Sequence, residues 1–187
     1  MDELIVLAKT TFLNRFNPDE TVEEALNKAV NRSVQRAYVY TPGISLARKA
    51  EIRKFWKKQL VELGEKYAEV QSVEVFESDM IELQKRMNIE FPNDFNNPKC
   101  ITCPSQIRLA QAQKSLSLYL KHLWCMGLIP VPPVCPVDTL ILKKTAIPSE
   151  YRNWKCICTM EEYRFRLNAI NLAAGDLTVV EWELLNY

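Results

Sequence analysis

Lys114 and Asp138 are the two side chains in this sequence whose types and surroundings best define a chemistry. Cleaving an N-glycosidic bond requires a group that stabilises positive charge on the sugar while the base leaves. A lysine amine can attack the anomeric carbon and form a Schiff base when burial or neighbouring cations lower its pKa. An aspartate at a helix N-terminus stays ionised and oriented, so it can activate that amine or stabilise the sugar. The pair therefore indicates a base-excising enzyme.

Lys114 belongs to a long helix that the periodicity predicts over about residues 105–126. Its apolar face is formed by residues at three- and four-residue steps: Leu109, Ala112, Leu116, Leu120 and Leu123. The polar residues predicted to lie away from that face are Arg108, Gln111, Lys114 and Ser117. Gly127 fits the C-terminal cap of this helix.

Asp138 stands at the far end of a rigid connection. The segment 129–133, IPVPP, cannot continue a helix and is predicted to be extended. Asp138 then precedes a short helix predicted over 139–144, for which it is a good N-cap. A linker of this kind can bring Lys114 and Asp138 together.

Two short segments here resemble the core of the helix-hairpin-helix DNA glycosylases. They are Gln113-Lys114-Ser115, followed by an apolar helix, and Pro136-Val137-Asp138-Thr139-Leu140-Ile141. In that superfamily a lysine begins a helix, and a V-D-T-[hydrophobic] segment one helix and a turn later supplies the catalytic aspartate. The match covers residues 108–144 of the 187. It lacks the family's glycine hairpin before the lysine, and Leu140 stands where many members carry histidine.

The resemblance implies a DNA N-glycosylase, with or without lyase activity at the abasic site, in which Lys114 is the Schiff-base nucleophile and Asp138 the activating carboxylate. Its partner would be double-stranded DNA with a modified base. Such an enzyme flips the target nucleotide out of the duplex, so it needs phosphate contacts and rings that stack on the base. The candidate nucleic-acid contacts are Arg108, Lys121, His122, Lys143 and Lys144. The candidate stacking residues are Trp124, Tyr119, Trp154 and Phe95.

The same residue types also have ordinary interpretations. A lysine on the polar side of a helix is normally a solvated charge, and an aspartate at a helix start is normally a cap that stabilises the helix by ~1 kcal/mol. Large aromatic residues more often belong to the core. A second function class therefore stays open: a non-enzymatic helical module that binds nucleic acid or a protein partner. It rests on the predicted helix over 45–63, where Phe55 and Trp56 accompany the basic residues Arg48, Lys49, Arg53, Lys54, Lys57 and Lys58.

The cysteines leave two interpretations open, which are free thiols and a metal site. In a chain expected to be intracellular, six cysteines do not indicate a disulfide framework. The pairs Cys100-x-x-Cys103 and Cys156-x-Cys158 together offer four thiolates, which is the ligand set of a closed tetrahedral zinc site. No other cofactor is expected.

The composition limits the remaining function classes. With 24 basic and 23 acidic residues, any contact with nucleic acid must come from a local basic patch. Four glycines and the absence of a phosphate-loop motif nearly exclude a nucleotide-cradling loop. The first ten residues carry acids where a secretory signal carries positive charge, and no segment approaches the roughly 18 apolar residues of a membrane span. The protein is therefore expected to be soluble and cytoplasmic.

Helical periodicity runs through almost the whole sequence, which predicts an all-α fold. The chain length suits a single domain over 1–187. The turn-rich loop 88–106 is predicted to separate two helical subdomains with a cleft between them. Another helix is predicted over 73–87, and further helix starts are predicted at the capping residues Asn17, Ser45, Thr159 and Asp176.

Overall fold

The computed structural model describes residues 2–35, 38–97 and 105–187. Within these ranges the chain forms helices joined by loops, and it contains no β-strand beyond an isolated bridge between Tyr40 and Phe95. The predicted all-α fold is therefore confirmed for the described residues. None of the helices in these ranges is long and apolar enough to cross a membrane. The elements are α1 (Asp2–Phe16), α2 (Val22–Val34), α3 (Leu46–Gly64), the 3-10 helix η1 (Glu65–Ala68), α4 (Val73–Glu90), α5 (Leu109–Cys125), α6 (Thr139–Leu142), η2 (Ser149–Tyr151), η3 (Trp154–Cys156), α7 (Met160–Ala174) and α8 (Val179–Asn186).

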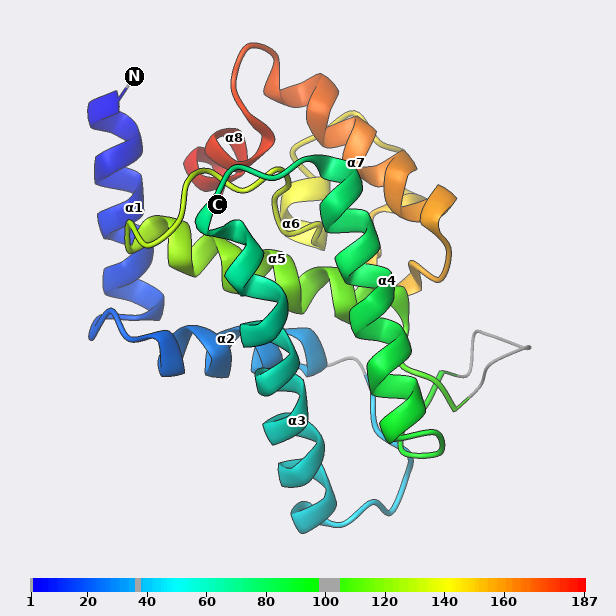
Figure 1. Ribbon diagram of the computed structural model, residues 1–187. Helices are drawn as coiled ribbons and strands as arrows, with labels where there is room; N and C mark the ends of the chain where they lie inside the picture. Colours follow the sequence, from blue (N-terminus) through cyan, green and yellow to red (C-terminus); the bar gives the residue numbers. More distant parts are fainter. Residues whose placement is uncertain (1, 36–37, 98–104) are drawn as a thin grey trace.

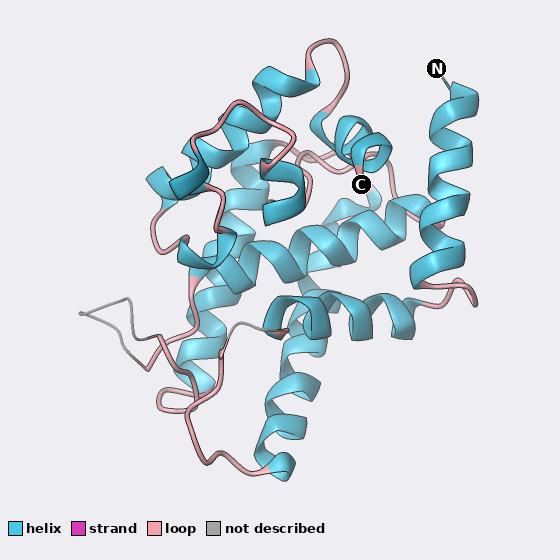
Figure 2. Ribbon diagram, turned by 180° about the vertical axis from the view of Figure 1, so that it is seen from behind, coloured by secondary structure: helices cyan, strands magenta, loops and turns pink. Residues whose placement is uncertain are grey.

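Helix α5 passes through the middle of the molecule, with the other helices arranged around it (Figure 1). Figure 2 shows the same central helix from behind. Helices α1, α2, α3 and α4 all contact it, and every residue from Leu109 to Cys125 is buried. The predicted outward polar face of this helix is therefore wrong, because neighbouring helices enclose α5 on all sides. Any hydrogen-bond partner of its polar side chains must therefore lie inside the protein.

The ends of the two helices that carry the predicted pair follow local chemistry. Helix α5 stops at Cys125, and Gly127 adopts φ +75° just beyond it. The N–H of Leu128 then donates to the carbonyl of Leu123 at 2.9 Å, which closes the helix end as the glycine predicts. Asp138 caps α6, as predicted, although this helix is shorter than the predicted 139–144.

Two other predicted caps are also confirmed. Ser45 accepts the N–H of Arg48 at the start of α3. Thr159 and Glu162 form a complete capping box at the start of α7. These starts were accessible to prediction because the groups that make the caps lie within a few residues of one another.

The predicted caps Asn17 and Asp176 are wrong. Thr21 caps α2 and Thr178 caps α8, each a few residues later in the chain. Asn17 instead closes the turn before α2: its side-chain amide donates to the carbonyl of Thr21 at 2.9 Å, and its side-chain oxygen accepts the N–H of Thr21 at 3.1 Å.

Helix α4 continues past Met87 to Glu90, so it takes up the first residues of the segment 88–106 that the sequence predicts as a loop. Helix α5 begins at Leu109, because Arg108 before it has an extended backbone. Residues 98–104 lie outside the described ranges. The division into two subdomains stays a prediction.

Candidate functional site

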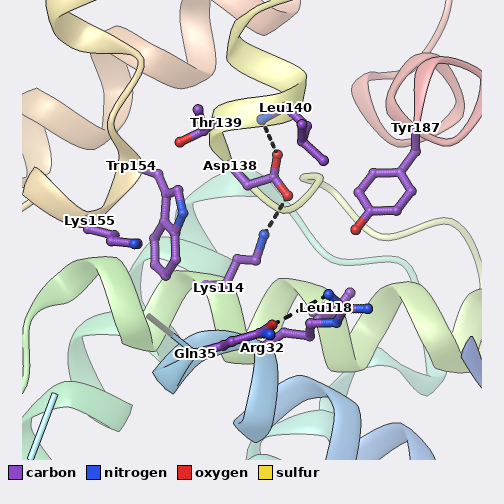
Figure 3. A pocket seen from close by; sticks show the side chains of 10 residues that line it. All are labelled: Arg32, Gln35, Lys114, Leu118, Asp138, Thr139, Leu140, Trp154, Lys155 and Tyr187. Atoms are coloured by element: carbon purple, nitrogen blue, oxygen red, sulfur yellow. Dashed lines mark hydrogen bonds and ion pairs between the residues drawn. The ribbon is translucent and has the colours of Figure 1, made fainter. Parts of the chain in front are cut away.

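The proline-rich linker returns the chain to α5 and brings the N-terminus of α6 next to Lys114 (Figure 3). Nζ of Lys114 lies 2.6 Å from Oδ2 of Asp138. The other carboxylate oxygen, Oδ1, accepts the backbone N–H of Leu140 at 2.9 Å and that of Ile141 at 3.1 Å. The cation therefore holds one oxygen and the helix N-terminus holds the other, so the carboxylate is fixed in position from both sides.

Gln113 holds the linker in register with α5. Its side-chain NH₂ donates to the carbonyl of Val137 at 2.9 Å, and its side-chain oxygen accepts the N–H of Val137 at 3.3 Å. The side chain of Gln113 is fully buried. Gln113 precedes Lys114, and Val137 precedes Asp138. This pair of hydrogen bonds therefore determines where the amine and the carboxylate meet.

Lys114 and Asp138 line a pocket of about 320 Å³, called the Lys114 pocket below. The indole of Trp154 forms a wall beside them, with its ring centroid 5.3 Å from Nζ of Lys114. Tyr187 faces the pair from the other side (Figure 3). The remaining lining residues are Arg32, Gln35, Leu118, Thr139, Leu140 and Lys155.

The surroundings of Lys114 favour a neutral amine more than water does. Burial lowers the pKa of Lys114 because the ammonium loses its hydration, and the smaller effect of Asp138 opposes this. A lysine with a lowered pKa carries more of the uncharged, nucleophilic form near neutral pH. The side chain keeps contact with the pocket, with the residue 7% exposed. Lys114 therefore combines a depressed pKa with access for a small ligand.

The charge of the Lys114 pocket is positive on balance. Arg32 and Lys155 contribute cationic side chains to its lining, in addition to Lys114. Asp138 is the carboxylate among the lining residues, and Lys114 already pairs with it. A pocket with this balance suits a ligand that carries negative charge.

The aromatic residues predicted to stack on a base do not share one place in the structure. Trp154 lines the Lys114 pocket. Trp154 is buried, as are the other candidates Trp124, Tyr119 and Phe95, but those three do not line the pocket. The structure therefore brings Trp154 to the predicted pair and leaves the other rings in structural positions.

Some residues predicted to contact phosphates are enclosed by the fold. Arg108 donates to the backbone carbonyls of Lys155 at 3.0 Å and Asn96 at 3.3 Å, so it joins two segments of the protein. Lys121 and His122 are almost fully buried on α5. None of the three offers a surface group that a phosphate can reach in this structure.

Lys143 and Lys144 are exposed, as the predicted contacts require. They follow the C-terminal end of α6, whereas Asp138 caps its N-terminal end. Lys144 lines a separate hollow beside α7. A phosphate that binds these lysines would therefore lie outside the Lys114 pocket.

The structure describes two of the four cysteines predicted to bind zinc. Cys156, the last residue of η3, and Cys158 are partly buried, and Cys100 and Cys103 lie outside the described residues. Within the described ranges, no group of three or more His, Cys, Asp or Glu side chains gathers in a metal-binding arrangement. Zinc at these cysteines stays a prediction.

Several pocket residues have no signal in the sequence. Arg32 comes from the last turn of α2, and Gln35 follows it. Tyr187 reaches the pocket from the residue after α8. Tertiary packing alone brings these three to Lys114. Leu118 is different, because a residue four positions after Lys114 on a helix must share its face.

Comparisons with known proteins find no relative that assigns a function. No family model matches the sequence, and no curated protein or solved structure matches it significantly. The geometry of the Lys114 pocket and the chemistry of its residues are therefore the basis for a function.

Proposed function

We propose that the protein is a DNA N-glycosylase with lyase activity that acts on a modified base flipped out of duplex DNA. The observation that carries this proposal is the contact of 2.6 Å between the amine of Lys114 and the carboxylate of Asp138 in a pocket beside an indole ring. An amine nucleophile, a carboxylate to activate it and room for a small ligand are the parts that this chemistry needs.

The reaction begins with proton transfer. Asp138 Oδ2 accepts a proton from the Lys114 ammonium, which leaves a neutral amine. The amine nitrogen then forms a bond to C1′ of the sugar as the N-glycosidic bond breaks. The base leaves with the electron pair of that bond and takes up a proton. Opening of the sugar ring gives a Schiff base between Lys114 and C1′, and β-elimination of the 3′ phosphate from this intermediate is the lyase step.

The rest of the pocket supports the same reaction. Trp154 presents a ring on which a flipped base can stack, a contact worth roughly 1–3 kcal/mol per base. Arg32 and Lys155 supply positive charge for the phosphates on either side of that nucleotide. The sequence resemblance to helix-hairpin-helix DNA glycosylases assigns Lys114 and Asp138 the same two roles.

Borohydride trapping tests the proposal directly. The protein is mixed with labelled duplexes that carry an abasic site or a panel of modified bases, and the reductant converts any Schiff base to a stable secondary amine. We expect a covalent adduct with the unchanged protein and none with Lys114→Gln. Lys155→Gln is the matched control, because Lys155 is a second lysine in the same pocket and its loss leaves the nucleophile in place.

Each outcome of this experiment has a definite meaning. If the adduct persists in Lys114→Gln and disappears in Lys155→Gln, the nucleophile is Lys155 and the proposed role of Lys114 is wrong. Base release without an adduct, when it depends on Asp138, indicates a glycosylase that activates water. Neither adduct nor release across the panel rejects the enzyme and favours the non-enzymatic binding module. Circular dichroism of each variant shows whether the fold is retained.

A further inference from the structure

A second positively charged hollow lies between α2 and α3, called the α2–α3 groove below. Its volume is about 550 Å³. Apolar side chains of both helices form part of its lining, including Leu26 and Val61. Its polar lining residues are Asn27 and Asn31 from α2, and Arg53, Lys54, Lys57 and Lys58 from α3, together with the carboxylate of Glu23.

The carboxylates near the α2–α3 groove do not neutralise it. Glu23 pairs with Lys57 at 2.7 Å. Lys58 lies 3.6 Å from Glu62, and both side chains are well exposed, so this pair contributes little. Among the described residues Lys54 has no carboxylate partner. The groove therefore keeps a surplus of mobile cationic side chains that can exchange their counterions for phosphates.

The aromatic residues of α3 do not belong to this surface, although the sequence places them beside the basic residues. Trp56 is fully buried and donates from Nε1 to the hydroxyl of Ser115 at 3.0 Å. Phe55 packs edge-on against Phe91, with ring centroids 5.4 Å apart. The lining of the α2–α3 groove consequently offers charge without aromatic rings on which a base could stack. A surface of that kind recognises a phosphate backbone and not individual bases.

The groove and the Lys114 pocket adjoin the same turn of α2. Asn31 lines the groove, and the next residue, Arg32, lines the pocket. Consecutive residues of an α-helix point about 100° apart around its axis, so the two hollows lie on adjoining sides of α2. A strand whose flipped nucleotide occupies the pocket can therefore continue around α2 into the groove.

We propose that the α2–α3 groove binds the phosphate backbone of the DNA strand that leads away from the Lys114 pocket. This inference rests on the proposed function for the identity of the partner. It explains how the protein grips DNA without the glycine hairpin that the sequence lacks: the α3 lysines and arginine supply the phosphate contacts.

The test measures binding of a duplex that carries a reduced abasic site, which cannot form a Schiff base. Dissociation constants are determined from about 0.05 to 0.3 M salt for the unchanged protein and for Lys54→Gln/Lys58→Gln. Losing two phosphate contacts should reduce the slope of log affinity against log salt by about 2 and weaken binding roughly 60-fold at 0.1 M salt. Lys85→Gln is the control, since it removes an exposed positive charge from α4 outside the groove.

A slope reduced in the groove variant and unchanged in Lys85→Gln supports the proposal. Equal slopes in all three proteins overturn it. Trapping on the unchanged protein separates this result from the proposed function. If an adduct forms but the salt slopes of the three proteins are equal, the glycosylase proposal is retained and the groove proposal is rejected. A reduced slope with no adduct on any substrate retains the groove as a phosphate surface and rejects the glycosylase chemistry.

Discussion

Helix α5 carries two buried lysine–carboxylate pairs that differ in their surroundings. Lys114 pairs with Asp138 at 2.6 Å, and Lys121 pairs with Glu183 at 2.5 Å. The two lysines are about two turns apart on one face of the helix, or ~10 Å. The comparison between them separates an ion pair that lines a pocket from one that is enclosed between helices.

The carboxylates differ in their support. Asp138 caps a helix, and both of its oxygens have partners. Glu183 lies inside α8, and its oxygen Oε1 is buried without a hydrogen-bond partner among the described residues. Burial raises the pKa of Glu183, because the carboxylate has lost water that Lys121 only partly replaces. Both oxygens of Asp138 therefore have protein partners, whereas one oxygen of Glu183 has none among the described residues.

The lysines differ in their access. Both Lys114 and Asp138 line a pocket, with side chains 8% and 9% exposed. The Lys121 ammonium is sealed between the rings of Phe12 and Tyr187, 4.4 and 4.5 Å from their centroids. Tyr187 also lines the Lys114 pocket, so its ring is the partition between the two pairs. A buried charge pair thus becomes a candidate site only when a ligand can reach it.

The largest effect is expected from Asp138→Asn. Asparagine caps a helix about as well as aspartate, so the fold should be retained, but the amide cannot accept the lysine proton. We expect the rate of borohydride trapping to fall by about 100- to 10,000-fold. The matched change at the sealed pair, Glu183→Gln, should alter that rate by less than about threefold. Similar losses in both variants would mean that the two pairs act as one unit.

The next largest effect is on the free energy of unfolding. Here the Lys121 pair should show the larger loss and the Lys114 pair the smaller one. Lys121→Met leaves the charge of Glu183 buried and uncompensated, which should lower the free energy of unfolding by about 3–5 kcal/mol. Lys114→Met should cost only about 1–2 kcal/mol, since Asp138 keeps two backbone N–H partners and contact with the pocket. Urea unfolding midpoints measure both. The double variant Lys121→Met/Glu183→Leu should recover most of the loss, and a failure to recover would show that Glu183 is not the cause.

Local chemistry made much of the fold predictable. A threonine with a glutamate three residues later marks a helix start, and this pattern correctly predicts the start at Thr159. The same pattern occurs at Thr21 and Thr178, where it decides the start over the competing residues Asn17 and Asp176. These two errors were avoidable, because the capping pattern combines two groups and a single asparagine or aspartate offers one.

The burial of α5 was not predictable from its own residues. Its polar positions have normal helical spacing for a solvated face, and only the surrounding helices show that Gln113 and Lys121 are enclosed. The partner of Lys114 was predictable, because a short rigid linker limits where Asp138 can lie. The partner of Lys121 was not, since Glu183 belongs to a helix at the other end of the chain.

A third prediction tests whether register, and not only proximity, maintains the Lys114 pair. Gln113→Leu leaves the buried N–H and carbonyl of Val137 without partners, at a cost of about 2 kcal/mol of unfolding free energy. Trapping should slow at the same time, because Asp138 loses its fixed position. Gln111→Leu is a matched control: Gln111 is buried on the same helix, and both polar atoms of its side chain lack partners in the described structure. The Gln111→Leu change should leave the free energy of unfolding unchanged or raise it. A loss comparable to that of Gln113→Leu would show that the Gln113 effect arises from general packing.

The smallest expected effect is a pH dependence of stability, which tests whether water is excluded from the surroundings of Lys121. The neighbouring residue His122 is the single histidine of the sequence. Burial, followed by the charge of Lys121, lowers the pKa of His122 from 6.5 to about 3. The unfolded chain therefore takes up a proton below pH 6.5, while the folded protein does not do so until about pH 3. The stability that neutral His122 allows is present above pH 6.5 and is lost as the pH falls through this window.

Urea unfolding at pH 8 and pH 5 measures this loss while most carboxylates stay ionised. We expect the free energy of unfolding to be about 2 kcal/mol lower at pH 5, and His122→Leu should remove that difference. A difference that persists in His122→Leu would arise from other groups. If instead neither protein loses stability at pH 5, His122 is protonated in the folded state. Water would then reach the Lys121 end of α5 as it reaches Lys114, and access would no longer distinguish the two pairs.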